Sequence, residues 1–302
     1  MTMSRHRLFA AIAAAAMSAA AVAAPMQWPD LTDRPRPQAS TRLAYAKGDL
    51  RYAELWLPKG RGPFPVVLMV HGGCWQTDVA DLSIMDWAAE DLRRRGIAVW
   101  NIEYRGIDRP GGGYPGTYQD VALAADTLRR LAPLFSLKAD KVVVVGHSAG
   151  GHLGLWLGAR SGIPAGSPLH AARPLAVSSI ISLGGLPDLA AQIAEPAGCG
   201  AEPAEAMAGP QKATRPDRFR DTSPPAMDAA APNQILVSGV EDAIAPPSLA
   251  AAYAAKMQRK GVKPRLVTIP DEGHVELIAP GSRAWDVVVA LIRRELGIEA
   301  AE

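Results

Sequence analysis

Short, uniformly apolar runs alternate along this chain with segments of helical periodicity, and this alternation restricts the fold more than any other feature. The runs at 66–70 (VVLMV) and 142–145 (VVVV) carry no polar residue on either face. Strands of this kind are typical of a parallel sheet that helices cover on both faces. The sequence therefore predicts an α/β protein with a doubly wound, mostly parallel sheet.

The other expected elements follow in strand–helix order. Further strands are expected at 97–104, 141–146, 178–183, 234–238 and 265–269, and helices at 82–95, 117–131, 149–159, 248–260 and 282–296. Ahead of them, residues 42–46 and 51–57 contain strand-forming residues around the turn Lys47-Gly48-Asp49, which predicts an antiparallel hairpin. We expect residues 42–302 to form one domain.

Residues 186–226 interrupt this alternation. The segment is rich in proline and glycine and has only weak helical periods, around 189–194 and 201–208. A connection of about 40 residues within a compact domain is usually a functional insertion, such as a lid over an active site. We therefore predict a small cap insertion here, with an inert surface excursion as the alternative.

The N-terminus has the pattern of an export signal. A basic start with Arg5 and Arg7 precedes an alanine-rich apolar stretch, and small residues lead up to Pro25. Residues 1–24 are thus predicted to be a signal peptide cleaved near Ala24, which implies a periplasmic or secreted protein; an alanine-rich amphipathic helix is the alternative. Residues 25–41, with four prolines, predict an extended arm over the surface.

Charge and hydropathy exclude several classes of protein. The chain has 32 basic and 30 acidic residues, and loss of the signal peptide would remove two arginines. This balance predicts no binding to nucleic acid or to an anionic membrane surface. No internal apolar run reaches 18 residues, so we expect no integral membrane association. Cys74 and Cys199 lie far apart in the sequence, which leaves open whether they form a disulfide or are two isolated apolar residues.

The clearest motif is Gly146-His147-Ser148-Ala149-Gly150, which has the form G-x-S-x-G. It stands directly after an expected buried strand and directly before an expected helix. Such a turn presents the serine hydroxyl at the carboxyl edge of the sheet on a strained backbone. The motif predicts that Ser148 is a nucleophile; the alternative is a plain glycine-rich turn.

A serine hydroxyl needs a base, and the base needs an acid that orients it. Of the downstream histidines His152, His170 and His274, only His274 follows the last expected strand, from which a loop can reach the same sheet edge. We therefore predict His274 as the base. Asp242, in the loop after the penultimate strand, is predicted as the acid, which gives the order Ser, Asp, His. The competing carboxylates are Glu241, Asp188, Asp271 and Glu272.

The stretch His71-Gly72-Gly73-Cys74-Trp75 follows the strand at 66–70. A tetrahedral intermediate needs backbone N–H donors fixed where negative charge develops. We predict an oxyanion hole formed by the N–H groups of Gly73, Cys74 and Ala149, although the choice between neighbouring loop amides stays open by one position. His71 is expected to fix this loop by hydrogen bonding.

Together HGGCW at 71–75, NIEYRG at 101–106 and GHSAGG at 146–151, followed by Asp242 and His274, resemble the α/β-hydrolase fold. The likeness is to the esterase/lipase branch that includes kynurenine formamidases with their HGG-x-W loop. The resemblance implies acyl transfer to water through an acyl-serine, with no metal or organic cofactor and with a small-molecule ester or amide as substrate. We expect a carboxylesterase-like hydrolase; the alternatives are an arylformamidase, a peptidase-type amide hydrolase and a non-catalytic binding module.

Overall fold

The computed structural model describes residues 24–231 and 233–298. All of the predicted signal peptide except Ala24 lies outside the described residues. Among the helices of the described part, none is both long and apolar enough to cross a bilayer.

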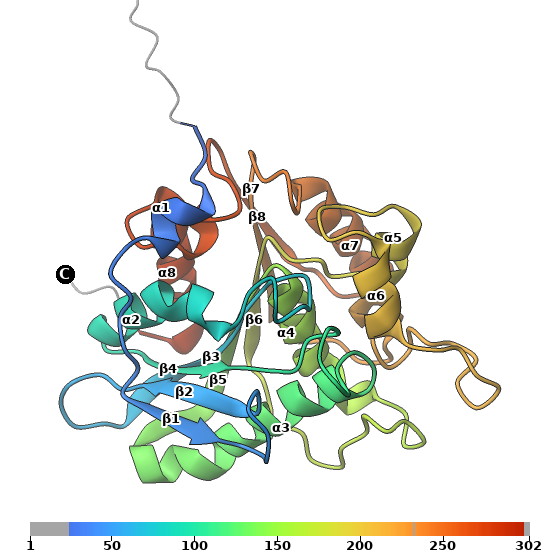
Figure 1. The fold of residues 1–302 in the computed structure, drawn as a ribbon, viewed down its shortest axis with the longest axis horizontal. Coiled ribbons are helices and arrows are strands. Elements are labelled where there is room, and N and C mark those ends of the chain that lie inside the picture. The colour runs from blue at the N-terminus through green and yellow to red at the C-terminus, as the bar shows by residue number, and fades with distance from the viewer. Residues whose placement is uncertain (1–23, 232, 299–302) are drawn as a thin grey trace, which may run out of the picture.

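Eight strands form a single sheet in the order β1-β2-β4-β3-β5-β6-β7-β8 (Figure 1). The hairpin of β1 (Thr41–Ala44) and β2 (Tyr52–Trp56) is antiparallel, and β2 pairs antiparallel with β4 (Ala98–Ile102). All other neighbours pair in parallel, and these strands are β3 (Phe64–Val70), β5 (Leu137–His147), β6 (Ser179–Leu183), β7 (Asn233–Gly239) and β8 (Arg265–Ile269). The doubly wound sheet and the N-terminal hairpin are thereby confirmed.

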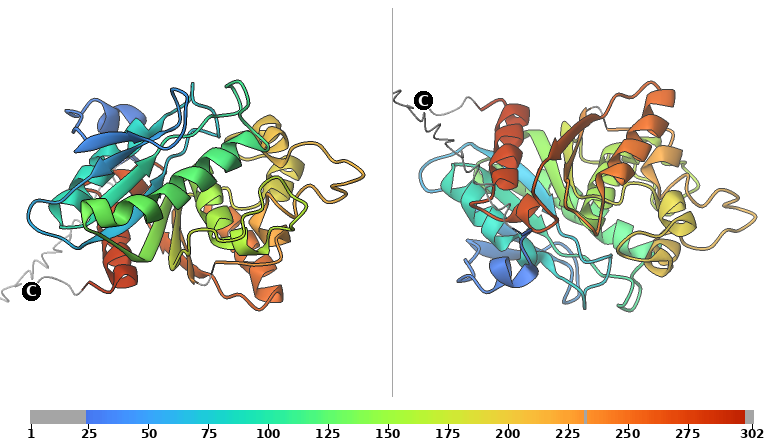
Figure 2. Two further views of the ribbon diagram at one scale, coloured as in Figure 1. Left: turned by 90° about the horizontal axis from the view of Figure 1, so that it is seen from below. Right: turned by 90° about the horizontal axis from the view of Figure 1, so that it is seen from above.

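Helices cover both faces of the sheet because successive strand residues point to opposite sides. In β3, Val66 and Leu68 join one apolar cluster whereas Val67 and Met69 join another. The first cluster packs against α3 (Gly116–Leu131), α4 (Ala149–Ala159) and α7 (Pro247–Arg259). The second packs against α2 (Asp86–Arg94) and α8 (Arg283–Leu296), so the sheet is enclosed from both sides (Figure 2).

Several element boundaries differ by one or two residues from the prediction, and two differ by more. The helix expected at 82–95 opens with a 3-10 turn, Leu82–Met85, before α2 begins. Strand β5 begins at Leu137 rather than at 141 because its first residues pair with Phe64 and Pro65, across a register shift in β3. Backbone pairing of this kind leaves the polar residues of β5 at the surface, where apolar periodicity gives no signal.

The prediction of an extended N-terminal arm was wrong for residues Trp28–Thr32, which form the short helix α1. The helix is favoured locally, because Pro29 stands in its first turn and the Gln27 N–H donates to Asp30 Oδ2 at 2.7 Å. Leu31 of α1 is fully buried in the apolar cluster that also contains α8. The arm is therefore a packed part of the domain.

The segment 186–226 contains two short helices, α5 (Leu189–Ala194) and α6 (Ala201–Ala208). Both lie where the weak helical periods predicted them. They pack against each other at the end of the molecule opposite α2, beside α7 (Figure 1).

Candidate active site

Ser148 occupies the turn between β5 and α4 with a left-handed backbone, φ 55° and ψ −121°. The turn is tight enough to require glycine on both sides. A Cβ at Gly146 would lie 2.1 Å from the Gly150 carbonyl oxygen, and one at Gly150 would lie 2.2 Å from that of Val70. Strain of this kind at a single non-glycine residue persists only where the surrounding structure enforces it.

His274 and Asp242 lie together at the same sheet edge. His274 Nδ1 is 2.7 Å from Asp242 Oδ2, and both side chains are buried. The other oxygen, Asp242 Oδ1, accepts from the N–H groups of Ile244 and Ala245 at 2.9 and 2.7 Å. A carboxylate only accepts hydrogen bonds, so Nδ1 carries a proton; in the neutral imidazole this tautomer leaves the Nε2 lone pair free.

Gly184, at the end of β6, provides the space for this pair. Its φ is +50°, and a Cβ there would lie 2.8 Å from Asp242 Oδ2 and 2.9 Å from His274 Nδ1. Any larger residue would therefore displace the acid or the imidazole.

The competing carboxylates are engaged elsewhere. Asp188 caps α5 through the Ala191 N–H at 3.2 Å and forms an ion pair with Lys256. Asp271 and Glu272 face Arg283 at 3.7 and 3.6 Å. The remaining competitor, Glu241, is exposed.

The other two downstream histidines also have their own partners. His152 is fully buried with Nε2 2.8 Å from the Thr222 carbonyl oxygen, and burial lowers the pKa of this imidazole to about 4. His170 Nδ1 lies 2.9 Å from the Ile163 carbonyl oxygen. Of the three, only His274 lines a cavity together with Ser148.

That cavity has a volume of about 310 Å³. Apart from the predicted catalytic residues and their neighbours it is mainly apolar, and no lysine, arginine, aspartate or glutamate of the described residues lines it. The lining residues are Trp28, Thr32, Gly73, Cys74, Val79, Ala80, Ile84, His147, Ser148, Ile244 and His274. It therefore suits an uncharged group better than a charged one.

The loop after β3 has three consecutive residues with positive φ, namely Gly73 at 95°, Cys74 at 53° and Trp75 at 57°. Within the described part of the chain, the N–H groups of Gly73, Cys74 and Ala149 donate no hydrogen bond. The loop and the start of α4 thus hold several unpaired donors close to Ser148. Such donors can stabilise an oxyanion.

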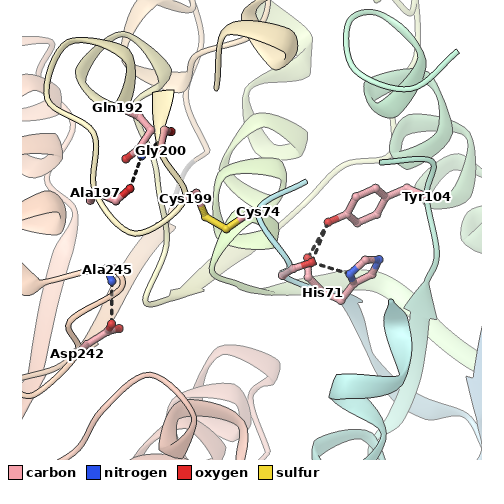
Figure 3. The surroundings of a disulfide bond; sticks show 10 residues. His71, Cys74, Tyr104, Gln192, Ala197, Cys199, Gly200, Asp242 and Ala245 are labelled. Atoms are coloured by element: carbon pink, nitrogen blue, oxygen red, sulfur yellow. Dashed lines mark hydrogen bonds between the residues drawn. A yellow bond between two sulfur atoms is a disulfide. The ribbon is translucent and has the colours of Figure 1, made fainter. Parts of the chain in front are cut away.

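His71 fixes this loop by hydrogen bonding, as the sequence predicted. Its Nδ1 lies 2.8 Å from the Gly72 carbonyl oxygen and its Nε2 lies 2.9 Å from Glu103 Oε1. Tyr104 stacks on the His71 ring at a centroid distance of 4.2 Å and donates to the His71 carbonyl oxygen at 3.0 Å (Figure 3). The supporting role of Glu103 was missed, although a glutamate at the end of a buried strand is a signal that could have indicated it.

A disulfide joins Cys74 to Cys199, with a Cα–Cα distance of 5.3 Å (Figure 3). The sequence left this pairing open. The bond connects the loop after β3 to the turn between α5 and α6. The insertion is therefore attached covalently to a residue that lines the cavity.

Two aromatic residues at the site were also missed. The ring of Trp28 lies edge-on to His147 and His274 at centroid distances of 6.0 and 6.3 Å. His147 Nε2 lies 3.1 Å from the His274 carbonyl oxygen, and burial lowers the pKa of His147 well below its usual value. His147 is therefore neutral and donates this hydrogen bond, which holds the backbone of the predicted base.

The described residues contain no group of three or more histidine, cysteine, aspartate or glutamate side chains that could hold a metal ion. The predicted absence of a cofactor remains a prediction.

Comparison with solved structures shows the same fold in several esterases. A truncated carbohydrate esterase from gut microbiota is 20% identical over 86% of this chain and 97% of its own, with a TM-score of 0.68. Esterase B from Lactobacillus rhamnosis is 19% identical over 85% of this chain and 84% of its own, with a TM-score of 0.69. The esterase Est2 from Thermogutta terrifontis is 18% identical over 92% of this chain and 100% of its own, with a TM-score of 0.64. These likenesses show that the chain has the α/β-hydrolase fold.

Comparison with curated proteins gives no match. The model of the BD-FAE family matches residues 54–257, from β2 into α7. Because this match spans more than half of the chain, the protein belongs to the BD-FAE family, a family of α/β-hydrolase esterases.

Proposed function

We propose that the protein is a serine hydrolase that cleaves uncharged carboxylic esters of small or medium size. The observation that carries this proposal is the convergence of Ser148 and His274 on one cavity, with His274 Nδ1 bound to Asp242. Family membership supports an ester as the substrate. The lack of lysine, arginine, aspartate and glutamate among the described lining residues supports an uncharged ester.

In the proposed mechanism, His274 Nε2 accepts the hydroxyl proton of Ser148 while the serine oxygen attacks the ester carbonyl. The N–H groups of Gly73, Cys74 and Ala149 stabilise the resulting oxyanion. The C–O bond to the alcohol then breaks, and the imidazolium of His274 gives its proton to the leaving alcohol. Water repeats the sequence on the acyl-serine and releases the acid.

Asp242 has a supporting role in this mechanism. Its hydrogen bond to Nδ1 keeps the imidazole in the tautomer that leaves Nε2 free, and its negative charge stabilises the imidazolium when it forms. The two backbone donors on Oδ1 keep the carboxylate from rotating away.

The disulfide also supports the predicted export. Structural disulfides persist in oxidising compartments and are rare in the cytosol. The Cys74–Cys199 bond is therefore in keeping with the periplasmic or secreted location that residues 1–24 predict.

The decisive test is the substitution Ser148→Ala. We expect kcat/KM for p-nitrophenyl acetate to fall by at least about 10³-fold, and labelling by a fluorophosphonate to be lost, while the thermal unfolding curve stays close to that of the parent. Ser161→Ala, at an exposed serine, is the matched control and should keep both activity and labelling.

Unchanged turnover in Ser148→Ala would refute the proposal, and a parent protein that no fluorophosphonate labels would favour the non-catalytic binding module. The family match does not single out the formamidase branch, so amide cleavage stays a prediction. Measurements of kcat/KM for N-formylkynurenine, a dipeptide amide and the short ester distinguish amide cleavage from ester cleavage. We expect the ester to give the highest value.

A further inference from the structure

The N-terminal arm contributes directly to the substrate cavity. Trp28 and Thr32 of α1 line it, although the next lining residue along the chain is Gly73. The indole of Trp28 is half-buried and lies against the rings of His147 and His274. One wall of the cavity is thus formed by a segment that belongs neither to the sheet nor to its crossover helices.

The position of Trp28 is fixed by anchors on both sides of it. Leu31, on α1, is fully buried in the apolar cluster that also contains α8, and the backbone N–H of Met26 donates to Glu276 Oε1. The other oxygen of Glu276 accepts from the Gly273 N–H at 3.0 Å. Since Gly273 immediately precedes His274, a single carboxylate holds both the arm and the loop that carries the predicted base.

Further along the arm, the Arg34 guanidinium donates to the Pro280 carbonyl oxygen at 2.8 Å, and Arg36 forms an ion pair with Asp86 at 2.6 Å. Trp87 Nε1 donates to the Pro35 carbonyl oxygen at 3.3 Å. These contacts lie outside the cavity. They hold the arm in place without touching the space where a substrate would lie.

The lining of the cavity also includes aliphatic side chains, those of Val79, Ile84 and Ile244. A rigid indole in the same cavity wall limits how long or bulky a group can be accommodated beside Ser148. A longer group would have to displace Trp28, and this would break the packing of the indole on His274.

We propose that Trp28 is a specificity-determining residue that restricts the cavity to short, uncharged aliphatic groups of the ester. The inference rests on the proposed ester hydrolysis. The arm would then complete the substrate site, and Glu276 would couple the position of the arm to that of the histidine loop.

The test measures kcat/KM over two ester series in the parent and in Trp28→Ala. One series varies the acyl chain (p-nitrophenyl acetate, butyrate and octanoate), and the other varies the alcohol (ethyl, butyl and octyl acetate). We expect the octanoate-to-acetate ratio or the octyl-to-ethyl ratio to rise by about 10-fold in Trp28→Ala, because removal of the indole opens the cavity on that side. Trp28→Leu, which keeps an apolar side chain, should shift the same ratio by less and serves if Trp28→Ala fails to fold.

Trp87→Ala is the matched control. It removes a tryptophan that holds the same arm from outside the cavity, and we expect it to leave both ratios unchanged. Ratios that stay constant in every Trp28 variant would overturn the inference, as would a Trp87→Ala variant that shifts them equally. A parent protein that hydrolyses no ester and takes no fluorophosphonate label would instead refute the proposed function, so the two failures are distinguishable.

Discussion

The sheet edge and the outer segments build this site in different ways. Ser148, Asp242 and His274 each follow a parallel strand, namely β5, β7 and β8, and the sheet itself brings them together. The walls of the cavity come from elsewhere, with Trp28 supplied by the arm and Cys74 tied to the insertion. In the proposed function, the sheet edge provides the chemistry, and the outer segments decide what reaches it.

The two outer segments also differ from each other in how they are held. The arm depends on burial of Leu31, on hydrogen bonds and on the Arg36–Asp86 ion pair. The insertion depends on the Cys74–Cys199 disulfide and on close packing, since a Cβ at Gly198 would lie 2.7 Å from Ile244. The attachment of the arm should therefore respond to pH, and that of the insertion to reductants.

The largest effect is expected at the sheet edge. Asp242→Asn should lower kcat/KM by about 10³- to 10⁴-fold, because an amide can favour the wrong tautomer of His274 and cannot balance the charge of the imidazolium. The loss should be uniform across the acyl and alcohol series, since Asp242 does not line the cavity. Steady-state kinetics on both series measure it.

Asp188→Asn is the control for this prediction. Asp188 was a competing candidate for the acid, but it pairs with Lys256, so its substitution should leave kcat/KM within about 3-fold of the parent value, the range of a change outside the reacting groups. A large loss in Asp188→Asn together with a small one in Asp242→Asn would reverse the assignment of the acid.

The difference between the sheet edge and the outer segments also explains which parts of the site could be predicted from the sequence. Apolar runs and the turn at Ser148 indicate where strands lie and where they end, so the fold class and the juxtaposition of Asp242 with His274 follow from local patterns. Trp28 gave no such signal, because its place depends on how a proline-rich arm packs on the finished domain. Pairing of Cys74 with Cys199 likewise depends on a distance between two loops that no spacing in the sequence encodes.

A smaller effect on turnover is expected where the insertion is attached. Cys199→Ser should lower the free energy of unfolding by about 2 to 4 kcal/mol, because the open chain gains conformational entropy. It should also lower kcat by about 10-fold for all esters, less than the loss of a whole oxyanion donor, since Cys74 stays in the loop but is held less firmly. Chemical denaturation and steady-state kinetics measure the two effects.

Treatment of the parent protein with a reductant provides the control, because it should reproduce both changes, and Cys199→Ser should show no further response to it. A Cys199→Ser variant with the stability of the parent would show that the insertion is held by packing alone.

The smallest effect on turnover is expected at the anchor of the arm. Asp86 is buried, its Oδ1 has no hydrogen-bond partner among the described residues, and burial raises its pKa to about 7 against the opposing effect of Arg36. Because an unfolded aspartate titrates near pH ~4, the folded protein binds more protons between about pH 4 and 7. The free energy of unfolding should therefore fall as pH rises through this window and level off above it.

Asp86→Asn should flatten this part of the pH–stability curve while kcat/KM at pH 8 stays close to that of the parent. Parallel curves for the two proteins would show that Asp86 is not the titrating group. Arg36→Ala separates the ion pair from burial, because the loss of the cation should raise the folded-state pKa of Asp86 and so extend the window to higher pH. If the arm and the insertion are anchored independently, the effects of Asp86→Asn and Cys199→Ser on the free energy of unfolding should add, and only Asp86→Asn should change its dependence on pH between about pH 4 and 7.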